Sequence, residues 1–124
     1  MKAIIANDFQ PLDKLVYGDW PEPEAGKGQI IIEAEAIGVN FPDGLLVQGL
    51  YQLRPETPFV PGMETAGKVV AVGEGVDGFA VGDRAAAMMP FGGYAERVAV
   101  PAATAMKLPE GMPADHACAL LVGF

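Results

Sequence analysis

Short hydrophobic segments, separated by glycine and proline, run along the whole chain. The 124 residues include 16 glycines and 11 prolines, spread from end to end, which leaves little room for long helices. The clearest pattern lies between Gln29 and Val39, where from Ile32 onward isoleucine and alanine alternate with Glu33 and Glu35. Because successive side chains of a strand point to opposite faces, this alternation predicts an antiparallel strand with one buried face.

Other apolar segments predict further short elements. The expected strands are Lys2–Ala6, Glu64–Val72, Arg84–Met89, Tyr94–Val100 and Ala105–Leu108. Asn40 followed by Pro42 is typical of a helix start, and Gly49 ends that short helix. A second helix is expected from Pro113, over residues 113–124. Short, closely spaced strands without alternating helices indicate a β barrel or sandwich and not a parallel nucleotide-binding sheet.

One glycine-rich segment matches a dinucleotide-binding pattern. Gly73, Gly75 and Gly78 have the G-x-G-x-x-G spacing and follow an expected strand. In a true fingerprint these glycines open a helix whose N-terminus holds the pyrophosphate. Here Gly82 and Pro90 follow too soon for such a helix. We therefore interpret the segment as a turn between two strands.

Composition excludes several classes of protein. The chain is 51% hydrophobic and 19% charged, with a formal net charge of −8 and no cluster of basic residues, which argues against disorder and against nucleic-acid binding. The apolar start of the chain is too short for a signal peptide, and no run approaches the length of a membrane span. With a single cysteine, a reducing compartment is expected. These features predict a soluble, cytoplasmic protein that binds neither nucleic acid nor membrane.

The inventory of metal ligands and nucleophiles is small. His116 and Cys118 are the only histidine and cysteine, and they stand two residues apart in the expected C-terminal helix. Side chains at this spacing point in different directions, so no zinc site is expected. Cys118 is interpreted as a small core residue and His116 as a surface residue. A Ser/His or Cys/His hydrolase has no support here.

The order of motifs resembles a known family. The segments that carry the resemblance are Ala36-Ile37-Gly38-Val39-Asn40-Phe41-Pro42-Asp43, Gln48-Gly49-Leu50-Tyr51, 58–76, Gly82-Asp83-Arg84 and Gly92-Gly93-Tyr94-Ala95-Glu96. This set is similar to the amino-terminal catalytic domain of the medium-chain dehydrogenase/reductase superfamily, in its zinc-independent NADPH:quinone oxidoreductase branch. In the zinc alcohol dehydrogenases of this superfamily a histidine precedes the glutamate of the corresponding strand. Met63 stands at that position here, and Asn40 stands where a cysteine is found.

The resemblance implies a mainly β fold, a GroES-like, partly open β barrel with short helices. It also implies that the nucleotide-binding Rossmann domain is absent from this chain. Residues 1–124 are then expected to be an incomplete GroES-like catalytic domain that ends at the crossing helix 113–124. The implied partner is the missing Rossmann domain or a second subunit of a homodimer.

The resemblance also implies chemistry. Members of this branch transfer a hydride from NADPH to a quinone, an enone or a small apolar carbonyl compound. Asn40 would lie beside the nicotinamide and donate to developing negative charge at the substrate, or serve only as a helix cap. Tyr51 would donate a proton to the enolate, or simply pack against the barrel. No zinc is expected.

Other residues have structural interpretations. Glu64 is expected to turn inward and form an ion pair with Arg84 or Lys68. Five apolar side chains can line a substrate cleft or pack in the core: Phe41, Phe59, Met88, Met89 and Phe91. Two functional hypotheses follow, the catalytic-domain part of an NADPH-dependent reductase and a non-enzymatic interaction or oligomerisation module.

Overall fold

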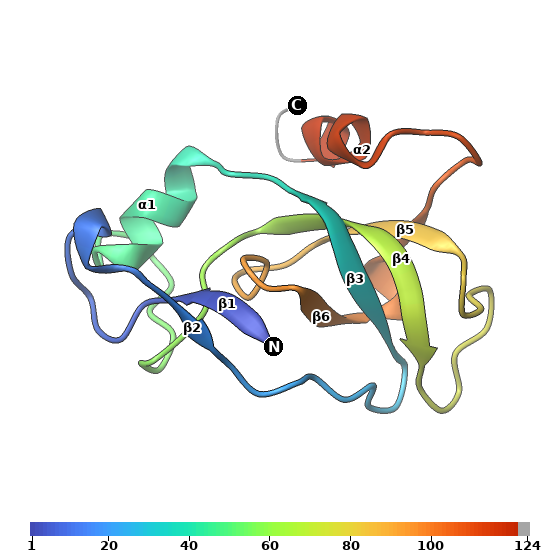
Figure 1. Ribbon diagram of the computed structural model, residues 1–124, viewed down its shortest axis with the longest axis horizontal. Coiled ribbons are helices and arrows are strands. Elements are labelled where there is room, and N and C mark those ends of the chain that lie inside the picture. Colours follow the sequence, from blue (N-terminus) through green and yellow to red (C-terminus); the bar gives the residue numbers. More distant parts are fainter. Residues whose placement is uncertain (122–124) are drawn as a thin grey trace.

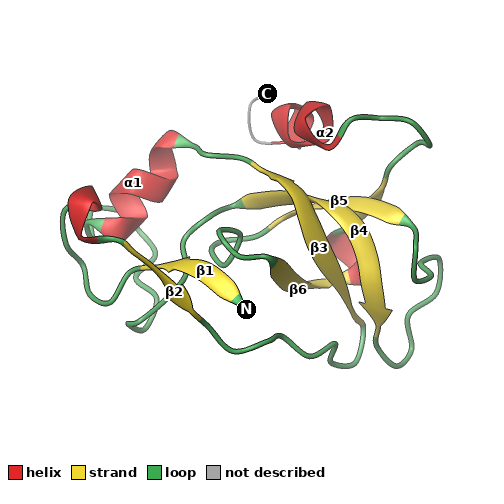
Figure 2. Cartoon of the chain, viewed as in Figure 1, coloured by secondary structure: helices red, strands yellow, loops and turns green. Residues whose placement is uncertain are grey.

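The structure, a computed structural model, describes residues 1–121. Its elements are β1 (Lys2–Ile5), β2 (Val16–Asp19), β3 (Gln29–Ile37), α1 (Phe41–Val47), β4 (Glu64–Val72), β5 (Arg84–Met88), β6 (Arg97–Pro101), β7 (Met106–Lys107) and α2 (Ala114–Leu121), with two 3₁₀ turns at Leu12–Lys14 and Ala102–Thr104. Loops connect short strands over most of the chain, as Figure 2 shows. The expected mainly β fold with short helices is confirmed.

The strands form two antiparallel sheets that share one core. The larger sheet has the order β6-β3-β4-β5-β7, and β1 pairs with β2 in the smaller one. The smaller sheet lies beside the larger one, with the helices at the margin of the molecule (Figure 1). A bridge between Ala3 and Ala95 and another between Ala6 and Phe59 connect the smaller sheet to the rest. This arrangement is the partly open barrel that the resemblance implied.

The central strand β3 has the predicted alternation. Ile30 and Ile32 are fully buried in the main core with Val69 and Val100. On the other face Glu33 pairs with Arg97 and Glu35 with Arg84, each at 3.1 Å between nitrogen and oxygen. The antiparallel strand with one buried face that the side-chain pattern predicted is therefore present.

One strand was not predicted, and the start of another needs correction. The pattern of side chains does not indicate β2, because its four residues include Gly18 and are mostly exposed. The strand expected from Tyr94 begins only at Arg97. Before that point the backbone joins the two sheets, since Ile4 N–H donates to the Tyr94 carbonyl and Ala34 N–H donates to the Glu96 carbonyl, at 2.9 and 2.8 Å. Residues 94–96 thus act as a connection between β1 and β3.

The glycine-rich segment between β4 and β5 is a turn, as predicted. Residues 73–83 contain no helix, and Gly75 and Gly78 have φ angles of +79° and +89°, a region that glycine adopts readily. No helix N-terminus is available there to hold a pyrophosphate.

The two helices agree with the predicted segments. Helix α1 begins after Asn40, and Gly49, with φ of +74°, follows its end. Helix α2 packs against β3, β4 and β5, and it covers the expected segment as far as Leu121. Residues 122–124 of that expected helix lie outside the described residues. No helix among the described residues is long and apolar enough to cross a membrane.

The backbones of β3 and β4 approach each other closely at Gly67, which leads to a first prediction. A Cβ atom at Gly67 in β4 would lie 1.9 Å from the Glu33 carbonyl oxygen of β3, so Gly67→Ala must force the strands apart. We expect the free energy of unfolding to fall by about 1–3 kcal/mol or more. Urea denaturation measures this. Gly18→Ala in β2, where the nearest atom is 3.5 Å away, is the control. Equal stability of the two variants would contradict the prediction.

Candidate functional site

The site is built where β3 leads into α1. Asn40 occupies the N-cap position of α1, with extended backbone angles of φ −126° and ψ 156°. Its backbone N–H donates to Oδ2 of Asp43, three residues later, at 2.9 Å. This is one half of a capping box, which satisfies a donor at the helix start. Asn40 thus stands at the helix N-cap, as expected, and its side chain has a partner outside the helix.

The Asn40 carboxamide contacts a buried glutamate. Asn40 Nδ2 donates to Oε1 of Glu64 at 3.0 Å, and Glu64 is only 3% exposed. Glu64 turns inward, as expected, but the expected partners Arg84 and Lys68 lie elsewhere. Strand register pairs Glu64 with Met88 and Lys68 with Arg84, which puts both basic residues about 13 Å along the strands from Glu64. Arg84 instead binds Glu35.

Asp43 joins a second long-range residue to this cluster. The Tyr94 hydroxyl donates to Asp43 Oδ2 at 2.6 Å, and Asp43 is 3% exposed. Burial raises the pKa of Tyr94 well above its ordinary value, and the hydrogen bond to Asp43 and the charges of Asp43 and Glu64 raise it further. The phenol is therefore a neutral donor held toward a carboxylate.

A mostly apolar cavity opens beside this cluster. Its volume is about 480 Å³, and Asn40, Asp43 and Tyr94 line it together with apolar side chains that include Val39 and Phe41. Val39 and Phe41 are about 80% and 81% exposed. The cavity therefore combines an apolar wall with the amides of Asn40 and Gln48, the Asp43 carboxylate and the Tyr94 phenol.

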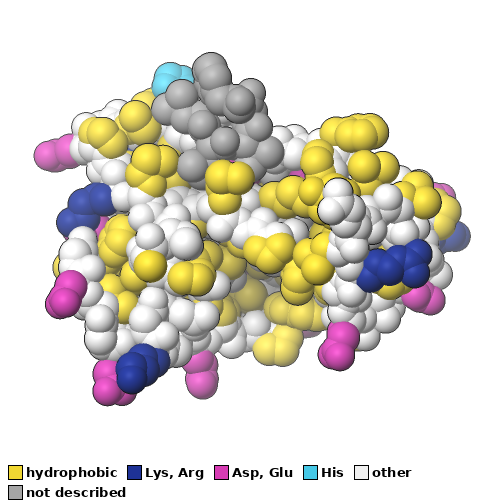
Figure 3. Space-filling view, turned by 180° about the vertical axis from the view of Figure 1, so that it is seen from behind, with side chains coloured by type: hydrophobic (Ala, Val, Ile, Leu, Met, Phe, Trp, Pro, Cys, Tyr) yellow, Lys and Arg dark blue, Asp and Glu magenta, His cyan; other side chains and the backbone are white. Residues whose placement is uncertain are grey.

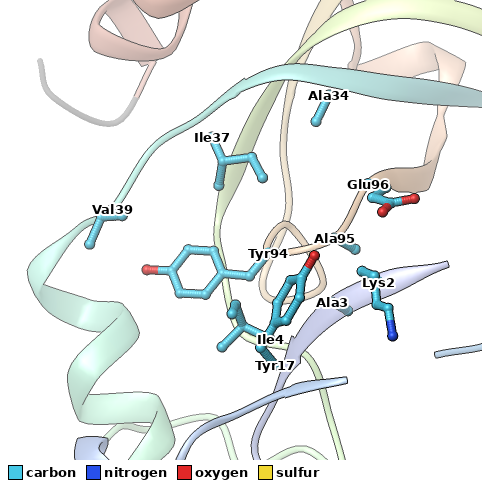
Figure 4. Close-up of a pocket in the computed structure, with 10 residues that line it drawn as sticks. All are labelled: Lys2, Ala3, Ile4, Tyr17, Ala34, Ile37, Val39, Tyr94, Ala95 and Glu96. Atoms are coloured by element: carbon cyan, nitrogen blue, oxygen red, sulfur yellow. The ribbon is translucent and has the colours of Figure 1, made fainter. Parts of the chain in front are cut away.

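A second cavity, of about 470 Å³, lies between β1, β2 and the end of β3. Figure 4 shows Tyr17 and Tyr94 side by side in it, below Ile37, with the Tyr94 hydroxyl directed toward the Val39 side. Val39 and Tyr94 line both cavities. Tyr94 therefore forms part of the wall that separates the two spaces.

Tyr51 lies in a different environment from Asn40. It is half-buried and packs against the apolar cluster of Ala6, Leu46 and Phe59. It is not among the described residues that line either cavity. The structure thus brings Asn40 together with Glu64, Asp43 and Tyr94, and it does not bring Tyr51 into that group.

The five apolar side chains considered for a cleft have different positions. Phe41 lines the cavity beside Asn40. Phe59 is buried, and the centre of the Phe91 ring lies 6.1 Å from that of Phe59 in an edge-on contact. Met89 packs against the main core, whereas Met88 is half-exposed. Only Phe41 of the five therefore lines the cavity beside Asn40.

Cys118 and His116 are placed as predicted. Cys118 is buried, its thiol lies 3.5 Å from the Ala36 carbonyl oxygen, and His116 is exposed. Burial and the nearby charge of Glu64 raise the pKa of the Cys118 thiol to about 11, so the thiol is un-ionised at neutral pH. Residues 1–121 contain no group of three or more His, Cys, Asp or Glu side chains suited to a metal ion.

Sequence reasoning missed Asp43 and Tyr94 as members of the site. The position of Asp43, three residues after an expected N-cap, was a usable signal for a capping box. Tyr94 gave no local signal, because it is 51 residues from Asp43 in the chain.

On the face shown in Figure 3 the Lys and Arg side chains lie apart from one another.

Comparison with known proteins gives matches along the whole chain. Residues 26–110 match the family described as the alcohol dehydrogenase GroES-like domain. The synaptic vesicle membrane protein VAT-1 homolog of Rattus norvegicus is 40% identical over 126 residues, which include all of this chain and 31% of that protein. The chain therefore spans about a third of the length of this relative.

Solved structures with the same fold include two quinone oxidoreductases. The enzyme from Thermus thermophilus, solved also in complex with NADPH, has 42% identity and a TM-score of 0.83, and the match covers 100% of this chain and 38% of that one. The enzyme from Escherichia coli, solved with NADPH, has 29% identity and a TM-score of 0.90, covering 96% and 36%.

The hydrogen bond between Tyr94 and Asp43 makes a prediction for high pH. The folded protein raises the pKa of Tyr94. The neutral Tyr94 phenol therefore contributes its full stabilisation of the fold below about pH 10, and this stabilisation is lost as the pH rises further. Tyrosinate absorbance in the near ultraviolet should include a component that appears only above the ordinary pKa range of tyrosine, and Tyr94→Phe should remove that component. Tyr17→Phe, at an exposed tyrosine, is the control. Persistence of the component in Tyr94→Phe would contradict the assignment.

Proposed function

Because the chain belongs to the alcohol dehydrogenase GroES-like domain family, we propose that it forms the catalytic-domain part of an NADPH-dependent oxidoreductase. The reaction is hydride transfer to a quinone, an enone or a related activated double bond. The observation that supports this most is the polar cluster around Asn40 beside a mostly apolar cavity. The fold around it matches quinone oxidoreductases solved with NADPH.

The residues beside Asn40 suit one end of NADPH. A nicotinamide is a flat ring with a carboxamide, which suits an apolar cavity that presents the Asn40 amide. NADPH, when bound, supplies the hydride. The described residues offer no glycine-rich turn at a helix start for the pyrophosphate. We therefore propose that a nucleotide-binding domain or a second subunit holds the rest of the cofactor.

Asn40 and Tyr51 have separate proposed roles. One Nδ2–H of Asn40 is bound to Glu64, so its second N–H and Oδ1 are the atoms that can meet a ligand. The N–H can donate to negative charge that develops on a substrate oxygen. Tyr51 is the proposed proton donor, since a phenol is protonated at neutral pH and can protonate an enolate.

We also propose that the reaction needs no zinc. Met63 occupies the position of the histidine found in the zinc alcohol dehydrogenases that the sequence resembles. His116 and Cys118 lie on α2, one exposed and one buried, and cannot share a metal ion.

Binding and turnover test the proposal together. We expect the full-length natural polypeptide to bind NADPH saturably, by cofactor fluorescence, and to oxidise it when a quinone is added. Added chelator should leave the rate unchanged, because no metal takes part. A second candidate, a non-enzymatic interaction module, is favoured by the exposed Val39 and Phe41. Absence of saturable NADPH binding would support that module, and loss of turnover with chelator would restore a zinc mechanism.

Tyr51→Phe tests the proton donor. Removing the hydroxyl should lower kcat for enone reduction by about 10²–10⁴-fold, the usual contribution of general acid catalysis. NADPH affinity should stay unchanged, because the ring still packs on its apolar cluster. Tyr17→Phe, an equal chemical change at an exposed tyrosine, is the matched control. An unchanged kcat in Tyr51→Phe would exclude Tyr51 as the donor.

A further inference from the structure

We propose that Glu64 and Tyr94 are positioning residues that fix the orientation of Asn40, Glu64 directly and Tyr94 through Asp43. The inference rests on the proposed function, in which Asn40 meets the cofactor and substrate. It adds two residues, one from β4 and one from the segment before β6, that act on the reaction through Asn40.

Glu64 fixes the side chain of Asn40. The Asn40 nitrogen donates to Glu64 Oε1, 3.0 Å away, so Oδ1 at the other end of the carboxamide faces elsewhere. Glu64 itself has little freedom, since it is 3% exposed and lies directly over Gly38. A Cβ at Gly38 would lie 1.6 Å from Glu64 Oε1, so the glutamate occupies the space of the missing side chain.

Tyr94 fixes the backbone of Asn40 through Asp43. Asp43 Oδ2 accepts from the Asn40 N–H at 2.9 Å and from the Tyr94 hydroxyl at 2.6 Å. Bonds to a carboxylate are stronger than neutral ones. Tyr94 is held in turn by its own backbone, since its N–H donates to the Pro61 carbonyl and its carbonyl accepts from Ile4 N–H, both at 2.9 Å. The start of α1 is thus tied to a segment that belongs to the sheets.

The two links act on different parts of one residue. Glu64 sets the rotation of the carboxamide, and Asp43 with Tyr94 sets the position of the Cα atom from which it projects. Misplacement of a reacting or contacting group by about 1 Å can cost about a hundredfold in rate. Loss of either link should therefore reduce turnover, because Asn40 would no longer be held in its position.

A spectroscopic test reads the orientation of Asn40 without activity. Selective ¹⁵N-asparagine labelling restricts the side-chain signals to asparagines, of which residues 1–124 contain two, Asn7 and Asn40. In the full-length natural polypeptide, Asn40→Ala identifies the Asn40 signal by its loss. We expect one Nδ2 proton of Asn40 to be shifted downfield by Glu64, and this shift to disappear in Glu64→Ala and to weaken in Tyr94→Phe. Tyr17→Phe should leave the signal in place.

The same variants give the kinetic arm. We expect Tyr94→Phe and Glu64→Ala to lower kcat/KM by about 10- to 100-fold and to weaken NADPH binding measured by fluorescence. Glu64→Gln keeps an oxygen that can accept from Asn40, so it should recover most of the kcat/KM and NADPH affinity that Glu64→Ala loses. If only the charge of Glu64 mattered for the structure, Glu64→Gln would not recover them. Gly38→Ala places a methyl group in the space of the Glu64 carboxylate, displaces that carboxylate, and should resemble Glu64→Ala. It serves as the second route if a buried-carboxylate variant fails to fold.

The outcomes separate the two proposals. The positioning proposal is overturned if, in both Tyr94→Phe and Glu64→Ala, the Asn40 Nδ2 proton keeps the chemical shift found in Tyr17→Phe and kcat/KM stays within twofold of the Tyr17→Phe value. If Asn40→Ala keeps full activity, the role of Asn40 in the proposed function fails, whereas the Asn40 signal still decides whether Glu64 and Tyr94 orient it. A changed signal together with reduced kcat/KM supports both.

Discussion

The antiparallel pairing of β3 with β4 is the constraint on which the candidate site depends. Its register places Ile37 opposite Thr65, so that Gly38, just after β3, faces Glu64 at the start of β4. The chain then needs only two more residues to reach Asn40. The Asn40–Glu64 hydrogen bond is therefore a direct product of sheet register, and it does not require a specialised loop.

This dependence explains which predictions succeeded. Local patterns located β4 with its observed bounds, the N-cap at Asn40 and the burial of Cys118, because periodicity, capping and apolar neighbours all act over a few residues. The partner of Glu64 was predicted wrongly because the prediction considered only opposite charges and not strand register. In the observed register Arg84 pairs with Lys68, at the opposite end of the β4–β5 pair from Glu64. Tyr94 could not be placed, since its position depends on the junction between two sheets.

The cluster is unusual in holding two buried carboxylates next to neutral donors. Asp43 accepts from a backbone N–H and a phenol, and its other oxygen, Oδ1, is buried with no hydrogen-bond partner. Burying a carboxylate in this way costs free energy that a helix cap alone does not require. Such a cost is typical of functional sites. The pKa of Tyr94 is raised mainly by burial, and the hydrogen bond to Asp43 and the charges of Asp43 and Glu64 add to the effect.

Gly38 has a consequence for how this protein can vary in evolution. Its missing side chain and the buried Glu64 side chain fill one volume, so a larger residue at 38 is compatible only with a shorter one at 64. The two positions are 26 residues apart in the chain, yet they behave as a single steric unit. Among homologous sequences they should therefore covary, and a lineage that exchanges this pair would have to orient its asparagine by other means.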